Sequence, residues 1–219
     1  MPSPEAIETR KGNLMSTSAS PPLSFYGPTP EGFPPLARLS VERYERMIDS
    51  GLFGDDDRFE LIEGTLVQKM TKKRGHSRGS EKSWREIQAL LPAGWHVEIE
   101  KPVRIPQRDS MPEPDVSVVR GEIDDYLELD PGPADLALVV EVSYSTVRAD
   151  RALAATYLGG GIPVYWLLNV RDRQLEVFTR EAGPHAPTIL DESDTVDLVI
   201  AGVVVGQIAV AKLLPTQAK

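Results

Sequence analysis

The sequence predicts one α/β (α+β) domain, built on a central mixed β-sheet with helices on its faces. Helix-like and strand-like segments follow one another in a mixed order, which is typical of a sheet covered by a few helices. Several strand candidates are also unbroken apolar runs, such as "LALVV" at 136–140, which indicates buried strands. With 219 residues, of which 41% are hydrophobic and 26% charged, the chain is long enough for one such core.

The first 37 residues are expected to form a mostly disordered N-terminal arm. They are rich in Pro, Ser, Thr and Gly and show no sustained hydrophobic period. The folded domain is therefore predicted to cover residues 38–219. No apolar run approaches the roughly 20 residues that a membrane helix needs, and no secretion signal opens the chain. We therefore expect a cytoplasmic protein without a membrane partner.

Composition restricts the chemistry that the chain can perform. It contains no cysteine, which removes disulfides, thiolate catalysis and cysteine-ligated zinc. Its 24 basic and 33 acidic residues give a formal net charge of -9. Such a chain repels nucleic acid on average, so a nucleic-acid function needs a local basic patch or a metal ion.

The N-terminal half of the domain is predicted to hold two helices separated by a hairpin. Ser40 can cap a first helix that Gly51 ends. Residues 59–62 and 65–70 are typical of two strands joined by a Glu63-Gly64 turn. A second helix is expected over residues 77–91, followed by the helix breakers Pro92 and Gly94. Its predicted apolar side consists of Trp84, Ile87, Leu90 and Leu91.

The C-terminal half is predicted to supply most of the sheet. Strand candidates are "WHVEIEKPVRI", "PDVSVV" and "DLALVVEVS", and a helix over residues 150–157 follows them. Three glycines at 159–161 end that helix, and "IPVYWLLNV" is the next apolar strand. "LEVFTR" returns after a turn. Residues 195–214 predict one or two further strands and a short final element.

Glu141 interrupts the most apolar strand, and a carboxylate in a core strand is costly unless something pairs with it. Because side chains alternate along a strand, its residues divide between two faces. One face is predicted to carry Leu136, Leu138, Val140 and Val142, and the other Ala137, Val139, Glu141 and Ser143. Glu141 then lies near the end of the strand, where a core face can open into a cleft.

Asp115 repeats this arrangement at the beginning of another strand, on a face with Ser117 and Val119. Two neighbouring carboxylates repel each other unless one is protonated or a cation neutralises both. A hard divalent ion such as Mg²⁺ binds oxygen ligands and can activate water. The alternatives are that Asp115 caps a turn after Pro114, and that Glu60, a third candidate, is a surface hairpin residue.

Several segments follow one another in a distinctive order. They are "LSVERYERM", "FELIEGTLVQKM", His76, "PEPDVSVV", "LALVVEVSYST", "GIPVYWLLNV" and "RQLEVFTR". Together they resemble the Uma family, a bacterial branch of the PD-(D/E)XK nuclease superfamily. The resemblance extends from about residue 38 to residue 213.

This resemblance implies a restriction-endonuclease-like fold and an endonuclease that hydrolyses DNA phosphodiester bonds with Mg²⁺ (or Mn²⁺). Asp115 and Glu141 match the metal-binding acids, and Glu60 matches a glutamate that completes such sites. The main-chain carbonyl of Val142 would be a further ligand. His76 would either touch substrate phosphate or be a surface residue at a helix start. Many such nucleases pair to cut two strands, so a homodimer is a further expectation.

The sequence departs from the superfamily pattern at its lysine. The position two residues after Glu141 is Ser143, and the alternative position in the next helix falls on Leu153 or Ala154. Arg148, Arg151 or Lys101 could supply positive charge, although arginine is a poor proton acceptor. The departure leaves a second hypothesis open, a catalytically impaired module of the same fold that binds nucleic acid or protein. A third, a metal hydrolase acting on another substrate, is favoured by the negative net charge.

One basic cluster could contact phosphates. It contains Lys69, Lys72, Lys73, Arg74, Arg78 and Lys82. On a nuclease these residues would offset the negative charge locally, and a solvated loop at a helix start is the alternative. The residues predicted to bind substrate are His76, Lys73, Arg74, Arg148 and Arg151.

Overall fold

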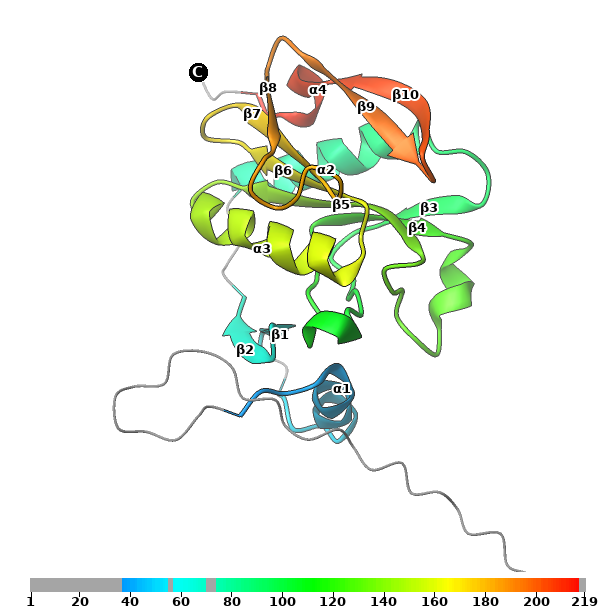
Figure 1. The fold of residues 1–219 in the computed structure, drawn as a ribbon, viewed down its shortest axis with the longest axis vertical. Helices are drawn as coiled ribbons and strands as arrows, with labels where there is room; N and C mark the ends of the chain where they lie inside the picture. Colours follow the sequence, from blue (N-terminus) through cyan, green and yellow to red (C-terminus); the bar gives the residue numbers. More distant parts are fainter. Residues whose placement is uncertain (1–36, 55–56, 70–73, 217–219) are drawn as a thin grey trace, which may run out of the picture.

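The computed structural model describes residues 37–54, 57–69 and 74–216 (Figure 1). Residues 1–36 of the predicted N-terminal arm lie outside the described residues, as do Lys72 and Lys73 of the basic cluster. Within the described part, no helix combines the length and hydropathy that a membrane span requires.

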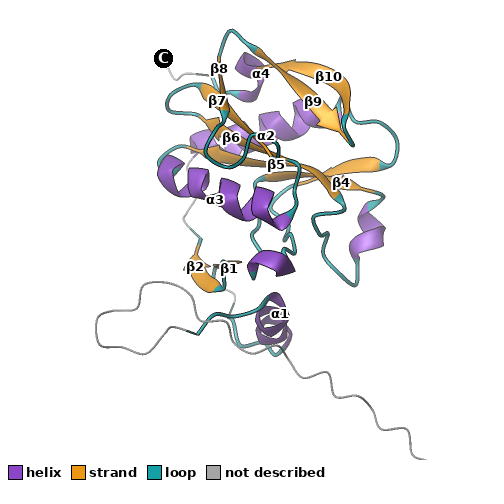
Figure 2. Ribbon diagram, viewed as in Figure 1, coloured by secondary structure: helices purple, strands orange, loops and turns teal. Residues whose placement is uncertain are grey.

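A six-stranded mixed sheet forms the centre of the domain, as predicted (Figure 2). Its strands, in spatial order, are β3 (Trp95–Glu98), β4 (Val116–Arg120), β5 (Leu136–Ser143), β6 (Val164–Asn169), β7 (Gln174–Thr179) and β8 (Thr188–Asp191). Only the β5–β6 pair is parallel, and the other neighbouring strands are antiparallel. The parallel pair is connected by helix α3 (Val147–Gly160), because parallel strands need a crossover.

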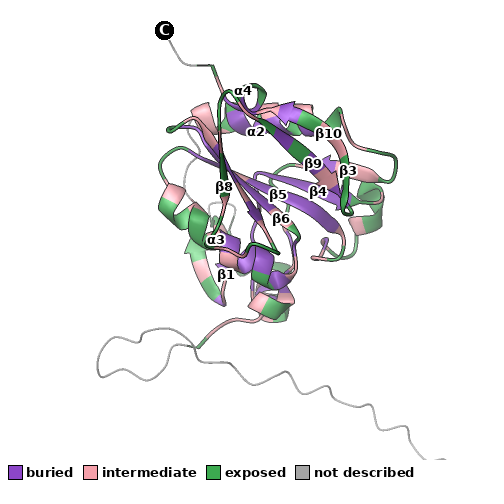
Figure 3. Ribbon diagram, turned by 45° about the horizontal axis from the view of Figure 1, so that its top comes forward, coloured by how far each residue is buried: buried purple, intermediate pink, exposed green. Residues whose placement is uncertain are grey.

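Helices cover both faces of the sheet (Figure 1). Helix α3 packs on one face, over a core that includes Val139, Tyr157 and Tyr165. The other face is covered by α2 (Arg74–Gln88), α4 (Val210–Leu213) and the hairpin of β9 (Thr195–Ile200) and β10 (Val203–Ala209). Trp166 is the largest buried side chain of that second core. The central strands β4, β5 and β6 are consequently buried along most of their length (Figure 3).

The N-terminal elements form a smaller layer beside the sheet. Helix α1 (Val41–Asp49) packs on the hairpin of β1 (Phe59–Ile62) and β2 (Thr65–Gln68) around Val41, Tyr44, Leu61 and Met111. The Met111 amide donates a 2.7 Å hydrogen bond to the Leu61 carbonyl. This bond attaches the hairpin to the segment that leads into β4. Two short 3-10 helices, η1 (Pro106–Arg108) and η2 (Ile123–Tyr126), complete the connections.

The predicted division of β5 into two faces is wrong at the beginning of the strand, because β5 contains a bulge there. The register with β4 shifts so that Val118 opposes Leu138 and Val119 opposes Leu136, which leaves Ala137 unpaired. Leu136 therefore lies in the α3-side core, although Leu138 lies in the other. From Val139 onward the predicted alternation is confirmed.

Several element boundaries also differ from the predictions. The strand expected at 95–105 ends at Glu98, because Glu100 has a positive φ of 53° and Pro102 follows it. Helix α2 begins three residues earlier than predicted, at Arg74, in a polar stretch without an apolar period. Trp84 is 38% exposed, so it does not belong to the apolar side of that helix.

Helix α3 similarly extends beyond the predicted 150–157 at both ends. Its first turn contains Asp150, an acid that favours a helix N-terminus. Strand β8 was not predicted, since its residues Thr188–Asp191 are mostly exposed and carry no apolar alternation.

Candidate functional site

A pocket of about 480 Å³ opens between the β1–β2 hairpin, the ends of β4 and β5, and the first half of α3. Its wall contains a concentration of carboxylates: Glu60, Glu63, Glu113, Asp115, Glu141 and Asp150. Lys69 and His76 are the basic side chains that line it among the described residues. The three predicted acids, Asp115, Glu141 and Glu60, are thus brought together in one pocket.

Asp115 and Glu141 face each other across neighbouring strands. Val116 pairs with Val140 in the antiparallel β4–β5 ladder, so continuing this register sets Asp115 opposite Glu141. The Val142 amide donates a 2.7 Å hydrogen bond to Oδ2 of Asp115. The same oxygen lies 2.9 Å from Nε2 of His76, in the first turn of α2. Asp115, only 2% exposed, is therefore fixed from two sides.

Glu141 is held by a residue that sequence reasoning did not select. The Tyr157 hydroxyl, from α3, donates a 2.7 Å hydrogen bond to Oε1 of Glu141. Desolvation by the surrounding core, followed by the charges of Asp115 and Glu60, raises the pKa of Glu141 well above its usual range. The pocket therefore favours a proton or a metal cation at Glu141. The signal for Tyr157 in the sequence is an aromatic residue in the last part of the helix that follows Glu141.

Glu60 is paired with a lysine rather than lying on a free surface. Nζ of Lys69 lies 3.3 Å from Oε1 of Glu60, and it also forms an ion pair with Glu113. Desolvation raises the pKa of Glu60, and the neighbouring Lys69 opposes this rise. Sequence reasoning missed Glu113, although a residue two positions before Asp115 in an extended segment shares its face.

Asp150 adds a further acid from α3. The Thr146 hydroxyl donates a 2.6 Å hydrogen bond to Asp150 Oδ2, and Ser143 Oγ lies 3.4 Å from the Thr146 hydroxyl oxygen. Desolvation raises the pKa of Asp150, and these hydroxyl groups oppose the rise. In the sequence, Asp150 is only the start of a predicted helix, because its position in the pocket depends on how α3 crosses over the sheet.

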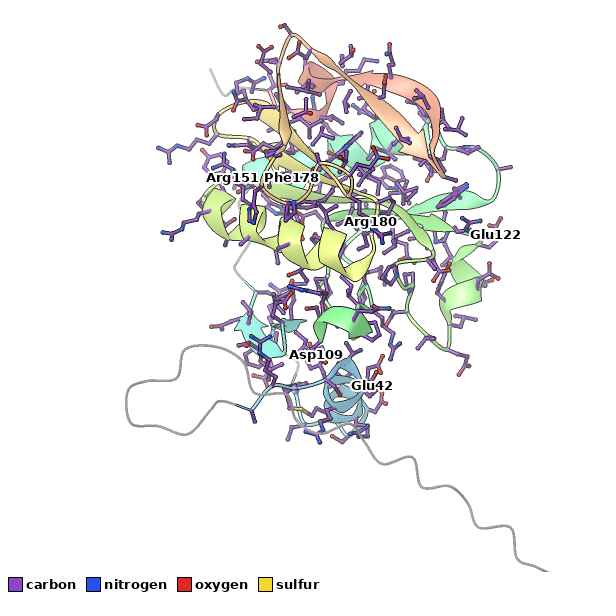
Figure 4. All side chains as sticks on the ribbon, in the orientation of Figure 1. Glu42, Asp109, Glu122, Arg151, Phe178 and Arg180 are labelled. Atoms are coloured by element: carbon purple, nitrogen blue, oxygen red, sulfur yellow. The ribbon has the colours of Figure 1, made fainter. Side chains whose placement is uncertain are left out.

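The predicted arginines do not line the pocket. Arg74 and Arg148 are exposed on their helices. Arg151 donates to both carboxylate oxygens of the buried Glu176 on β7, at 2.6 and 2.7 Å, and Figure 4 labels it on α3. Lys101 is exposed in the loop after β3. None of the three arginines therefore lines the wall that carries the carboxylates.

The positions where the superfamily pattern would carry lysine are all uncharged. Ser143 is fully buried, and Ala154 is buried in the core beneath α3. Leu153 does line the pocket, so a longer polar side chain at this position would reach the acidic wall.

The donor set suits a hard divalent cation. Asp115 and Glu141 offer carboxylate oxygens from adjacent strands, and Val142 lines the same pocket. Within the described ranges, no three acidic or histidine side chains already surround one point. A bound ion would therefore also draw on main-chain oxygen, water or a rotated Glu60 side chain.

Comparisons with known proteins identify both sequence and structural relatives. A family model described as "Uma2: Putative restriction endonuclease" matches residues 41–210. The fold is similar to a crystal structure described as "a putative nuclease belonging to DUF820" from Anabaena variabilis ATCC 29413. That comparison has a TM-score of 0.60 at 16% sequence identity and covers 80% of this chain and 97% of the other. It confirms the predicted fold class. Among curated proteins, no sequence matches this chain.

Proposed function

The chain belongs to the Uma2 family, and from this membership and the acidic pocket we propose that it is an endonuclease dependent on Mg²⁺ or Mn²⁺ that hydrolyses DNA phosphodiester bonds. One observation carries the proposal: Asp115 and Glu141 lie opposite each other at the end of a buried strand pair, in an open pocket. Such a pair is costly to keep charged without a cation, and it provides the oxygen ligands that a divalent ion requires.

Asp115 and Glu141 would hold the ion, with Glu60 and the main-chain carbonyl of Val142 as additional ligands. When bound, the ion would neutralise phosphate charge and lower the pKa of a water molecule, which makes that water a nucleophile at neutral pH.

The residues around these acids have positioning roles. Tyr157 restrains the carboxylate of Glu141 through its hydrogen bond to Oε1. The Val142 amide and His76 fix Asp115 in the same way. Such outer partners set the orientation of metal ligands and usually matter nearly as much as the ligands themselves.

The test is nicking of supercoiled plasmid in the presence of Mg²⁺ or Mn²⁺. The near-isosteric variants Asp115→Asn and Glu141→Gln are expected to lose this activity, because each removes a charged oxygen ligand. Glu181→Gln, at an exposed acid outside the pocket, is the matched control and should nick like the parent. Nicking that persists unchanged in both pocket variants would contradict the assignment.

A catalytically impaired binding module of the same fold is the second candidate. It is favoured by Ser143, which is buried and uncharged where the superfamily pattern has lysine. A DNA-binding measurement distinguishes the two candidates when it is combined with the plasmid assay. Metal-dependent nicking supports the nuclease, whereas DNA binding without any nicking supports the binding module.

A further inference from the structure

We propose that Lys69 is the catalytic cation of this pocket and that its ammonium group contacts the phosphate under attack. This inference rests on the nuclease function proposed above. Lys69 would supply the positive charge that is absent at Ser143 in β5 and at Leu153 and Ala154 in α3. In the sequence, Lys69 was only one member of a basic cluster.

The position of Lys69 is fixed by the hairpin that carries it. Its amide donates a 2.8 Å hydrogen bond to the Arg58 carbonyl, which continues the β1–β2 pairing one step beyond Gln68. The bond between Met111 and Leu61 in turn ties this hairpin to the segment before β4. The hairpin therefore delivers Lys69 to the same pocket as Asp115.

The ammonium group itself is held inside the acidic wall. The side chain is 18% exposed, and Nζ contacts carboxylates from two separate elements, Glu60 on β1 and Glu113 before β4. A lysine used only for solubility would direct its charge into water instead.

The other cations of the described residues do not occupy this role. Arg151 is engaged by Glu176, and Arg148 and Lys101 do not line the pocket. The ring of His76 faces Asp115 through Nε2. Arg38 and Arg108 form ion pairs with Glu63, but neither arginine lines the pocket. Among the described residues, Lys69 is therefore the only lysine or arginine that lines the pocket itself.

The chemistry of the side chain allows an exchange of partners. Lysine presents a compact charge with three donors on a flexible stem, so it can move between a carboxylate and a phosphate oxygen. A divalent ion that takes Glu60 as a ligand would compete with Lys69 for that carboxylate. The ammonium group would then be free to stabilise the charge that develops on phosphate in the transition state.

The first test compares Lys69→Ala with Lys212→Ala, a control lysine that is 65% exposed on α4, beyond the opposite face of the sheet. In single-turnover cleavage, Lys69→Ala is expected to lose about 10²- to 10³-fold in rate. Binding of a fluorescein-labelled DNA duplex is measured separately in Ca²⁺, over a range of salt concentrations. Loss of one phosphate contact should lower the slope of log K against log[salt] by about 1. Lys212→Ala should change neither quantity.

Two double variants separate a direct contact from charge neutralisation. If Lys69 only neutralises Glu113, Lys69→Ala with Glu113→Gln will recover parental cleavage and salt slope, and this recovery overturns the proposal. We expect no recovery in that variant. Lys69→Ala with Leu153→Lys returns an ammonium group to the pocket wall, so part of the lost rate and salt slope should return.

The binding measurement also distinguishes this proposal from the nuclease proposal. A parent protein that binds the duplex without cutting it contradicts the nuclease, whereas the salt slope still decides whether Lys69 meets phosphate. An unchanged slope in Lys69→Ala overturns the phosphate contact even if the parent cuts. A parent that does not bind the duplex overturns both.

Discussion

At the scale of single residues, Glu141 shows how a functional position conflicts with stability. Its side chain comes from a strand that is otherwise buried, and the core and Asp115 both penalise its charge. The hydrogen bond from Tyr157 compensates only in part. The negative charge of Glu141 is therefore energetically unfavourable in this pocket, and a bound cation would reduce that cost.

Replacement of Glu141 by Gln should make the protein more stable while it abolishes activity. The folded protein raises the pKa of Glu141 above its ordinary value of 4.5, so this group favours folding below that pH and loses the contribution as pH rises through the folded pKa. Gln cannot ionise and can still accept the Tyr157 bond. The gain should be small near about pH 4 and larger near about pH 8.

Thermal melts of Glu141→Gln and the parent at both pH values provide the measurement. Each kcal/mol gained raises the melting temperature by ~2–4 °C for a chain of this size. A variant that is less stable than the parent at the higher pH would refute this account of Glu141.

Tyr157→Phe isolates the orienting hydrogen bond. The ring stays in the core, where Tyr157 is fully buried, and only the hydroxyl group that contacts Glu141 is lost. Removal of such an outer partner typically lowers metal affinity or activity by about 10- to 100-fold. Mn²⁺ titration and plasmid nicking measure the effect, and unchanged values in both would show that Tyr157 only fills space.

At the scale of elements, the close approach of α2 to β5 determines where His76 lies. Gly79 makes this approach possible, because a Cβ atom at that position would lie 2.6 Å from Cγ1 of Val142. The same helix carries His76 in its first turn, next to Asp115. Packing between α2 and the sheet is therefore linked to the geometry of the pocket.

Gly79→Ala is expected to destabilise the domain by ~1–3 kcal/mol, the usual cost of overpacking a core. The displaced helix should also weaken Mn²⁺ binding, because His76 moves with it. Gly159→Ala is the control, since its new Cβ would make ordinary contacts at 3.6 Å with Arg108. Denaturant unfolding should show a loss for Gly79→Ala alone, and equal losses in the two variants would argue against a special contact at Gly79.

At the scale of the whole molecule, the pocket is assembled from segments that are far apart in the chain. The hairpin supplies Glu60 and Lys69, the strand pair supplies Asp115 and Glu141, and α3 supplies Asp150. The formal net charge of -9 makes this acidic concentration harder to maintain without a cation. Metal binding should therefore stabilise the entire fold.

Addition of Mn²⁺ is expected to raise the melting temperature of the parent. A ligand that binds only the folded state at 100 times its Kd stabilises that state by about 2.7 kcal/mol. Asp115→Asn should show little of this effect, and Glu181→Gln should show all of it. A shift of the same size in all three proteins would indicate metal binding elsewhere.

The sequence was sufficient for the parts of this arrangement that depend on local pattern. Alternation along the strands put Glu141 and Val139 on the correct face, and the mixed order of elements predicted the mixed sheet. The bulge at Ala137 was not predictable, because an inserted residue leaves the apolar run unbroken.

The contacts of Lys69 and Tyr157 could not be predicted for a different reason. Each depends on the packing of one element against a distant one, which neither hydrophobic period nor motif spacing describes. The sequence left open whether the basic cluster around Lys69 contacts phosphates or is a solvated loop. The attachment of the hairpin to the segment before β4 directs Lys69 toward Glu60.

The attachment at Leu61 also implies that the β1–β2 hairpin opens at a lower free-energy cost than the central sheet. The small cluster of Val41, Tyr44, Leu61 and Met111 holds the hairpin, whereas Asp115 and Glu141 belong to the large sheet. Local opening of the hairpin would withdraw Glu60 and Lys69 together and leave the other two acids in place. Hydrogen exchange should then be faster in β1 and β2 than in β5. On gentle heating, catalysis should stop before the sheet melts.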